Sequence, residues 1–311
     1  MKLYKDSIVY LLCPAYAASG GPEAIHALSQ ELNRIGINSI ICYIGYNGVG
    51  DPVHPLMKCY DIRYTQPKII NSERNIIIIP EVWPQYLNSV GDRIQKCFWW
   101  LSVDNSPVYK QNTLNCLPAD IHHFCQSQYA IDYLHTNGIV ENVSYVSDYI
   151  NSKYIDAMCD SYDKEDILIY NPAKGIEYTK LIINKLSDIQ CIPLCKLNHT
   201  QLIELYKRSK VYIDFGNHPG MDRIPREAAL FDNIVITNTT GSAYNDIDVN
   251  IPKHYKFNTA DTTPEIIATY IQQCVKNYNN CIREFDSYRQ KITNQYTRFV
   301  EDIKNVFLIN E

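Results

Sequence analysis

Short apolar runs alternate with amphipathic segments from the beginning of the chain. Residues 8–12 (IVYLL) form a continuous apolar run, which is typical of a strand buried inside a parallel sheet. Apolar side chains then recur at helical spacing through residues 22–35, with Pro22 expected as the first helical residue and Gly36 as the stop signal. The apolar run at 40–44 follows. This order predicts a strand, a helix and a second, parallel strand.

The same alternation continues in two series along the chain. The first series predicts a helix closed by Gly138, together with four strands: strands at 76–79, 97–101, 121–125 and 143–146, helix at 128–137. The second predicts four strands and three helices: strands at 167–170, 191–194, 211–215 and 234–237, helices at 176–186, 198–208 and 225–231. From Pro264 onward the pattern is helical.

Two such series predict an α/β fold of two doubly wound, Rossmann-like domains with C-terminal helices. The polar stretch 159–166 is the best linker candidate, because it lacks the apolar periodicity of its neighbours. We therefore expect one domain over residues 1–160 and a second over 161–285. Residues 286–311 are expected to form a C-terminal helix that is able to pack back on the first domain.

Composition narrows the functional classes. The chain has 311 residues, 46% of them hydrophobic, and a formal net charge of −5, so it is globular and presents no bulk basic field for nucleic acid. Its eleven cysteines include no CxxC pair and are interpreted as reduced, mostly buried thiols of a cytoplasmic protein. No run of 18 apolar residues occurs. A nucleic-acid partner and a membrane span are thus not expected.

Ligands of open α/β sheets bind beyond the carboxyl ends of the strands, so the loops there are the candidates for chemistry. After the first strand, Gly20 and Gly21 either let the backbone approach an anionic ligand at the start of the helix or simply form a tight turn. The segment 45–50 (GYNGVG) has the reverse of the GxGxxG spacing. A nicotinamide-dependent dehydrogenase is therefore disfavoured.

The segment 214–230 (DFGNHPGMDRIPREAAL) is the most informative loop. It leaves a strand, turns through glycines and enters a helix expected to start at Pro225, which places Glu227 in the first helical turn. Arg223 and Arg226, three residues apart, are expected to share a face and clamp a diphosphate or a sugar acid. The alternative is an exposed loop with these arginines paired to nearby carboxylates. The polar candidates of the loop are His218, Gly220, Asp222, Arg223, Arg226 and Glu227.

Two smaller loops are expected to join this segment. Asn171 and Lys174 follow the first strand of the second series, and Gly241 and Ser242 follow the strand after Glu227. An ammonium group at a helix N-terminus is electrostatically unfavourable unless an anion binds there, which gives Lys174 more weight than an ordinary surface lysine. A solvated lysine remains the alternative.

At this point three segments, in the right order, resemble the retaining nucleotide-sugar glycosyltransferases of the GT-B fold (group 1, family 4-like). Residues 19–36 resemble the family's glycine loop and first helix, 171–175 (NPAKG) its donor-phosphate loop, and 205–237 its donor-binding block. The resemblance implies two Rossmann-like domains that face each other across a cleft. It also implies a nucleotide-sugar donor with no further cofactor, retention of configuration, and a ribose contact by Glu227.

Departures from the family pattern leave the donor open. The family often has a second glutamate ahead of Glu227, and Pro219 stands near that position here, so His218 or Asp222 are the candidates to replace it. The family's arginine before the loop lysine has no counterpart near Tyr170. The His218–Pro219 pair also resembles transferases that use a cytidine-monophosphate donor.

For the acceptor side, the resemblance points to the loops after the central strands of the first domain. Asp104 fits by position as a contact to the acceptor or the transition state, with Asn105 beside it, although an ordinary turn residue is an equal alternative. Glu81 and Trp83 end the preceding strand and are expected to line the same cleft. For the tryptophans, core packing is preferred over sugar stacking.

The leading hypothesis is therefore a glycosyltransferase acting on a saccharide or lipid-linked glycan acceptor in cell-surface polysaccharide or glycoconjugate synthesis. Lys174 and Arg223 would stabilise the leaving phosphate, and Asp104 would act at the acceptor. No DxD pair lies in a suitable position after a strand, so a metal requirement is not indicated. A nucleotide-sugar epimerase and a non-catalytic glycan-binding scaffold are the alternatives. Basic and aromatic residues at 93–100 leave peripheral contact with the inner face of a membrane open, although a buried strand is preferred there.

Overall fold

The computed structural model describes residues 1–66 and 68–308, which form two compact units. The first unit combines Met1–Tyr149 with Tyr296–Glu311, and the second is Ile150–Gln295. The chain thus enters the second unit after Tyr149 rather than after residue 160, and it returns to the first unit at Tyr296. The helical tail expected over 286–311 is therefore divided between the two units.

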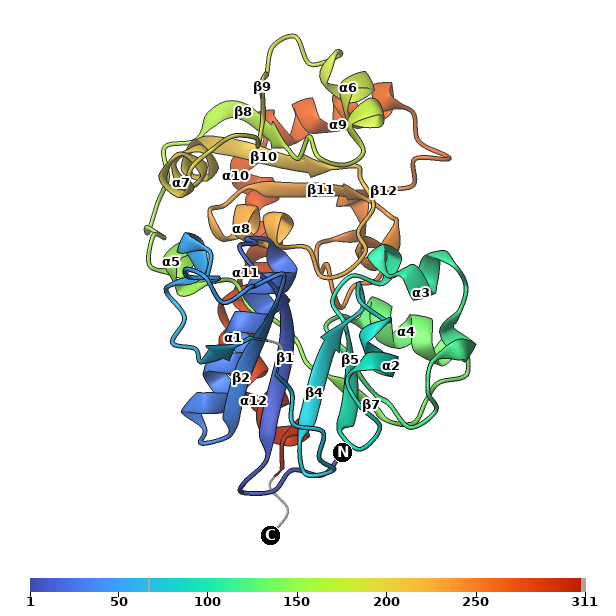
Figure 1. Ribbon diagram of the computed structural model, residues 1–311. Coiled ribbons are helices and arrows are strands. Elements are labelled where there is room, and N and C mark those ends of the chain that lie inside the picture. The colour runs from blue at the N-terminus through green and yellow to red at the C-terminus, as the bar shows by residue number, and fades with distance from the viewer. Residues whose placement is uncertain (67, 309–311) are drawn as a thin grey trace. The chain divides into compact units, whose positions relative to one another are not determined.

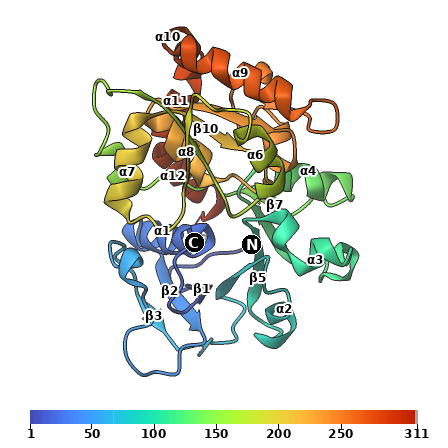
Figure 2. The same ribbon diagram turned by 90° about the horizontal axis from the view of Figure 1, so that it is seen from above.

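The first unit is built on a parallel sheet in the order β3-β2-β1-β4-β5-β6-β7 (Figures 1 and 2). Figure 2 shows β3, β2 and β1 side by side. The strands are β1 Ile8–Pro14, β2 Asn38–Ile44, β3 Tyr64–Thr65, β4 Ile76–Pro80, β5 Gln95–Trp100, β6 His122–Cys125 and β7 Val143–Tyr145. The α-helices are α1 Gly20–Arg34, α2 Tyr86–Ser89, α3 Pro107–Lys110, α4 Gln128–Thr136 and α12 Gln295–Val306.

Both faces of this sheet are covered, as the continuous apolar runs in its strands require. One core cluster contains Leu28 of α1 together with Phe299, Ile303 and Phe307 from the C-terminal segment. A second cluster covers the other face of the sheet, to which the alternate side chains of the strands point. It includes Trp100 and Leu134. The C-terminal segment is therefore part of the first unit's core.

The second unit is built on a parallel sheet in the order β12-β11-β10-β8-β9. Its strands are β8 Glu165–Tyr170, β9 Gln190–Pro193, β10 Ser209–Asp214, β11 Ile234–Asn238 and β12 Lys256–Phe257. Its α-helices are α5 Ser152–Ile155, α6 Ile176–Ile183, α7 His199–Arg208, α8 Arg223–Leu230, α9 Pro264–Lys276, α10 Tyr278–Cys281 and α11 Asp286–Thr293. Figure 1 shows α6 and α9 over one face of this sheet and α8 over the other.

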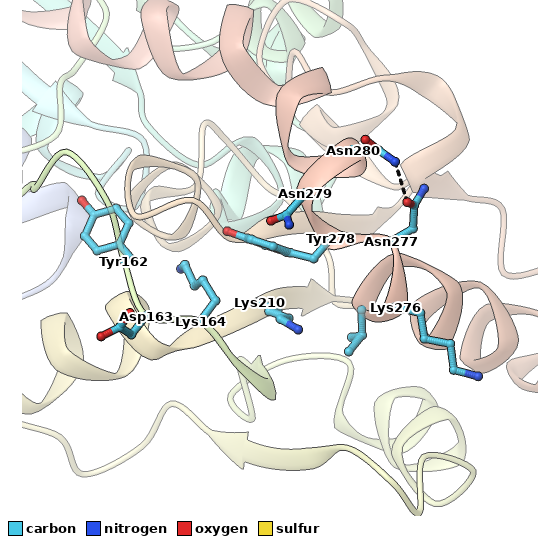
Figure 3. Close-up of a pocket in the computed structure, with 10 residues that line it drawn as sticks. Tyr162, Asp163, Lys164, Lys210, Lys276, Asn277, Tyr278, Asn279 and Asn280 are labelled. Atoms are coloured by element: carbon cyan, nitrogen blue, oxygen red, sulfur yellow. Dashed lines mark hydrogen bonds between the residues drawn. The ribbon is translucent and has the colours of Figure 1, made fainter.

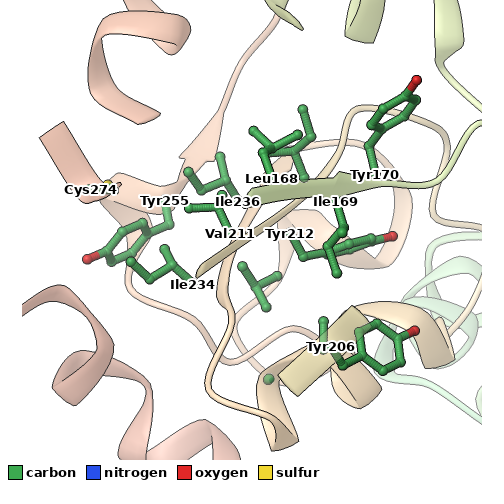
Figure 4. Packing of buried hydrophobic residues seen from close by; sticks show 14 of the residues in the cluster. Leu168, Ile169, Tyr170, Tyr206, Val211, Tyr212, Ile234, Ile236, Tyr255 and Cys274 are labelled. Carbon is green, nitrogen blue, oxygen red and sulfur yellow. The ribbon is translucent and has the colours of Figure 1, made fainter. Parts of the chain in front are cut away.

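The centre of the second unit is formed by apolar side chains of its three middle strands. Leu168, Val211 and Ile234 are buried at paired positions on β8, β10 and β11 (Figure 4). The start of α7 is fixed by its capping residues, because Asn198 and Gln201 form a complete capping box there. The expected starts of α7 and α9 are confirmed, whereas α8 begins at Arg223, ahead of the expected Pro225.

The tryptophans of β5 are core residues. Phe98, Trp99 and Trp100 have no exposed surface, so the basic and aromatic membrane-facing patch left open from the sequence is not present there. In the described part of the chain, no helix is both long and apolar enough to cross a membrane.

Candidate functional site

Three loops of the second unit meet at the carboxyl ends of β8, β10 and β11. Their close approach depends on glycine: a Cβ at Gly175 would overlap the Phe215 carbonyl oxygen, and a Cβ at Gly241 would overlap that of His218. Gly175 and Gly241 also have φ of +61° and +56°, in the region that glycine adopts most easily. The sequence therefore brings these loops together where ligands of such sheets bind.

Lys174 lies at the centre of this loop cluster. Its Nζ donates to Asp222 Oδ2 (2.5 Å) and to the Asn217 carbonyl oxygen (2.8 Å), and it lies 3.2 Å from Asp214 Oδ2. Burial alone would lower the pKa of Lys174, but the ion pairs with Asp222 and Asp214 outweigh it and raise the pKa. The side chain is a fixed positive charge that keeps 23% of its surface exposed.

His218 completes a charged network around this lysine. Its Nδ1 lies 2.7 Å from Asp222 Oδ2, while Nε2 is buried without a hydrogen-bond partner among the described residues, 3.9 Å from Asp214 Oδ1. Burial raises the pKa of Asp222, but the hydrogen bond from His218 and the charge of Lys174 lower it overall. Asp222 thus stays ionised between two basic side chains.

Asp214, His218 and Asp222 are also the residues of this site with the spacing of metal ligands. Their ligand atoms all lie within 4.8 Å of one another. The Lys174 ammonium already contacts both carboxylates, so a metal ion and this ammonium would compete for the same oxygens. In this structure the Lys174 ammonium is the cation that both carboxylates contact.

Arg226 differs from expectation. Its side chain is fully buried, and its guanidinium donates to the carbonyl oxygens of Met221 (2.7 Å) and Asp222 (3.0 Å) and to Gln295 Oε1 (3.0 Å). A guanidinium committed to the loop's own backbone cannot share a ligand-facing clamp with Arg223. The clamp prediction is therefore wrong for Arg226, which shapes the loop, while Arg223 remains partly exposed.

Glu227 also lies elsewhere on its helix than expected. Because α8 begins at Arg223, Glu227 is beyond the first turn, and the helix start does not favour its charge. Glu227 Oε2 instead accepts a hydrogen bond from the hydroxyl of Tyr206 on α7 (3.1 Å), and the side chain is 7% exposed. The sequence did not indicate Tyr206, since nothing local marks which face of α7 meets α8.

The remaining loop residues act on the backbone. Ser242 Oγ donates to the Gly220 carbonyl oxygen (2.6 Å), and the Ser242 backbone N–H donates to the His218 carbonyl oxygen (2.8 Å). In the Lys174 loop, Asn171 Oδ1 accepts a hydrogen bond from the Ala173 N–H (3.0 Å). The sequence interpretation missed two further groups. Asn238, the last residue of β11, and Thr240, just after that strand, both donate to the Gly216 carbonyl oxygen.

In the first unit, the predicted residues lie at the carboxyl edge of its own sheet. Gly20 and Gly21 open α1, so the helix begins before Pro22. A Cβ at Gly21 would be in ordinary contact with Leu101, 3.7 Å away, so close packing alone does not require glycine there. Asp104 accepts a hydrogen bond from the Tyr129 hydroxyl (2.7 Å), and Asn105 is exposed.

Glu81 is less accessible than an acceptor-binding role requires, whereas Trp83 is partly exposed. Glu81 is 2% exposed, and its Oε2 accepts from the Leu101 N–H (3.0 Å). Burial raises the pKa of Glu81 to about 8. Trp83 packs edge-on against Tyr86, with ring centroids 6.0 Å apart. Glu81 therefore supports the β4 and β5 ends rather than lining an open surface.

Comparison with known proteins identifies the fold of the chain. No protein-family model and no curated protein sequence matches the chain. Solved structures do match, over 97% of this chain. A glycosyltransferase from Rickettsia africae matches with a TM-score of 0.68 and 17% identity, over 97% of its own chain. Sucrose-phosphate synthase from Thermosynechococcus elongatus matches with a TM-score of 0.70 and 11% identity, over 98% of its own chain. S. aureus TarM, solved with fondaparinux, α-GlcNAc-glycerol and UDP, matches with a TM-score of 0.70, 11% identity and 99% of its chain.

The chain has the GT-B fold. The resemblance noted in the sequence is thereby confirmed at the level of architecture, with its two Rossmann-like sheets. Within this GT-B chain, the second unit holds the Lys174 loop cluster, and the first unit holds the separate residues after β1 and β5.

Proposed function

We propose that the chain is a glycosyltransferase that moves a sugar from a nucleotide-sugar donor to a saccharide acceptor. The observation that supports it best is the Lys174 ammonium, held by Asp214 and Asp222 at the carboxyl edge of the second sheet, with Glu227 on the adjoining helix. UDP in the TarM structure is the diphosphate that such a transfer releases. A partly exposed fixed cation suits that leaving group.

The chemistry follows from where charge develops. As the bond from the sugar to the diphosphate breaks, negative charge grows on the phosphate oxygens, and a preorganised ammonium stabilises that state more than the ground state. Lys174 and Arg223 would carry this role, without a metal. To do so, Lys174 exchanges part of its contact with Asp222 for the phosphate.

The carboxylate of Glu227 would accept hydrogen bonds from the donor's ribose, with Tyr206 fixing its orientation. Hydrogen bonds to a charged group contribute about 1.5–3 kcal/mol each, so this contact alone would change donor affinity measurably. Asp104 is proposed as the acceptor-side group in the first unit, and retention of configuration is proposed from the family resemblance.

Calorimetric titration with UDP, GDP, ADP and CMP tests the proposal. We expect one of them to bind, with Lys174→Met weakening it at least about tenfold because a charged contact is lost. Tyr206→Phe should weaken it by roughly threefold to tenfold, as expected for one hydrogen bond. Lys180→Met, an exposed lysine on α6, is the matched control. Binding of no nucleotide, or equal binding by the Lys174 variant, would reject the proposed site.

The reaction itself separates this proposal from an epimerase. When given only the sugar derivative of the nucleotide that binds, a transferase leaves this nucleotide sugar unchanged, and it transfers the sugar only after a saccharide acceptor is added. An isomerised nucleotide sugar formed without acceptor would contradict transfer.

A further inference from the structure

A pocket of about 660 Å³ opens at the opposite end of the second unit's strands from the Lys174 loop cluster (Figure 3). It lies where β8 and β10 begin and where α9 ends and α10 follows. It is lined by Tyr162, Asp163, Lys164, Lys210, Val275, Lys276, Asn277, Tyr278, Asn279 and Asn280. Three lysines and one aspartate line it, on a chain whose net charge is −5, and one of these lysines, Lys210, is also ion-paired with Asp166.

Lys164 supplies no free donor, and burial lowers its pKa to about 7, so at neutral pH it is only partly charged. Its Nζ donates to the carbonyl oxygens of Tyr206 (3.0 Å), Ser209 (2.7 Å) and Phe231, at the C-terminal ends of α7 and α8. An ammonium has three N–H groups, so these carbonyl oxygens use all of them. Helix C-termini favour a positive charge, which explains why this buried lysine is tolerated beneath the pocket.

Lys210 and Tyr278 form the wall next to it. Lys210 Nζ donates to Asp166 Oδ1 (2.5 Å) and lies 5.7 Å from the centre of the Tyr278 ring. The Tyr278 hydroxyl donates to the Asp232 carbonyl oxygen (2.6 Å), which fixes the ring. Figure 3 shows the Lys210 side chain beneath that ring. Two N–H groups of Lys210 remain for a ligand.

Amide groups complete the lining. Asn280 Nδ2 donates to Asn277 Oδ1 (2.7 Å), and Asn279 lies exposed beside the Tyr278 ring in Figure 3. Amides donate and accept, as sugar hydroxyls do, while tyrosine rings offer flat apolar faces with a polar tip. The volume is within the range of about 300–1,000 Å³ that small-molecule sites occupy.

We propose that this pocket binds an acidic saccharide, a sugar that carries carboxylate or phosphate groups. Lys210 contacts the acidic group, the asparagines bond the hydroxyls, and the rings of Tyr162 and Tyr278 pack against the sugar. The site is separate from the Lys174 loop cluster, since the two lie at opposite ends of β8 and β10. The choice of a saccharide rests on the proposed glycosyl transfer, whereas the lysines and the amide lining are properties of the pocket itself.

Calorimetric titration at pH 7 with tetragalacturonic acid, mannose 6-phosphate and the neutral maltotetraose tests this site. We expect at least one acidic sugar to bind more tightly than maltotetraose. Asn279→Asp, which adds a like charge without changing size, and Lys210→Gln should each weaken that binding by roughly tenfold or more. Asn305→Asp, an exposed asparagine on α12, is the matched control and should bind as the original chain does.

Several outcomes would overturn the assignment: no binding of either acidic sugar, equal binding of maltotetraose, or no effect of both pocket variants. Titration of the Lys174→Met variant separates the two sites. Retained saccharide binding is expected there, and its loss would place the sugar in the nucleotide site instead. If nucleotide binding fails in every variant while the acidic sugar still binds, the proposed transfer fails and the pocket assignment stands.

Discussion

At the scale of single residues, buried charge is distributed unevenly between the two units. In the second unit, Lys174 is neutralised by Asp214 and Asp222, so its charge is stable where solvent is largely excluded. In the first unit, no cation among the described residues pairs with Glu81, which accepts a backbone hydrogen bond instead. The ion pairs therefore keep Lys174 charged in spite of its burial, whereas burial without a paired cation favours the neutral form of Glu81.

Glu81 makes stability depend on pH. Its folded pKa of about 8 lies above the unfolded value of 4.5, so the folded state holds an extra proton between these values. Its contribution to the free energy of unfolding should be complete below pH 4.5 and lost as pH rises through about 8, with a slope of at most about 1.4 kcal/mol per pH unit. Urea titrations from pH 5 to 8 should show that Glu81→Gln flattens this decline.

The exposed Glu141 provides the comparison, because Glu141→Gln should leave the pH dependence unchanged. Parallel pH profiles for the original chain and Glu81→Gln would show that Glu81 is ionised in the folded state.

Single residues also mark how far the sequence predicts the site. Lys174 was identified because its position after a strand is local information, and the structure does place it in a loop cluster. Arg226 was misassigned because helical spacing gives the neighbours of a side chain on its own helix but not what covers it, and here Gln295 and two carbonyl oxygens do. Tyr206 escaped notice because its contact with Glu227 joins two helices.

At the scale of elements, the strands and helices were predicted well and their ends less so. Continuous apolar runs identified β1, β4, β8, β10 and β11, since strands covered on both faces leave that pattern. The two-residue strands β3 and β12 were missed, because so short a pairing has no periodicity of its own. The early start of α8 was missed because Pro225 is tolerated anywhere in the first turn.

Gly241 tests how the loops of the site are held together. Gly241→Ala places a Cβ on the His218 carbonyl oxygen at a φ of +56°, so it should both strain the backbone and displace the loop. We expect a loss well above the 1–2 kcal/mol of left-handed strain alone, measured by urea unfolding, and weaker nucleotide binding.

Gly138→Ala is a close control, since Gly138 has a φ of +82° and nothing within 4 Å of the added Cβ. It should show the strain without the overlap. Equal losses in both variants would mean that the close approach at Gly241 contributes nothing.

At the scale of the whole molecule, the C-terminal segment belongs to the unit that the N-terminus begins. Phe299 lies 5.1 Å from Tyr149, and Phe307 lies 5.7 Å from Phe124, ring centre to ring centre. Ser147 Oγ donates to Asp302 Oδ2 (2.5 Å) in the same region. The sequence suggested such a return but could not locate it, because helical periodicity alone does not show which core a helix joins.

Removing one of these side chains should therefore destabilise the first unit. Phe299→Ala is expected to cost about 3–5 kcal/mol, as for other buried aromatic residues. All three tryptophans (Trp83, Trp99 and Trp100) lie in the first unit, so tryptophan fluorescence during urea unfolding reports on that unit. The exposed Lys304→Ala is the control, and an unchanged fluorescence midpoint for Phe299→Ala would contradict this role.

The crossing back at Tyr296 has a consequence for biosynthesis. A ribosome releases residues 1–149 first, yet Phe299, Ile303 and Phe307, which join α1 in the core on one face of their sheet, are made only after the entire inserted unit. Units of a growing chain fold as they emerge, so the inserted unit is able to finish first, while the earlier-made one waits with apolar surface uncovered. Chaperones that shield nascent chains would accordingly be needed for residues 1–149 more than for the inserted unit.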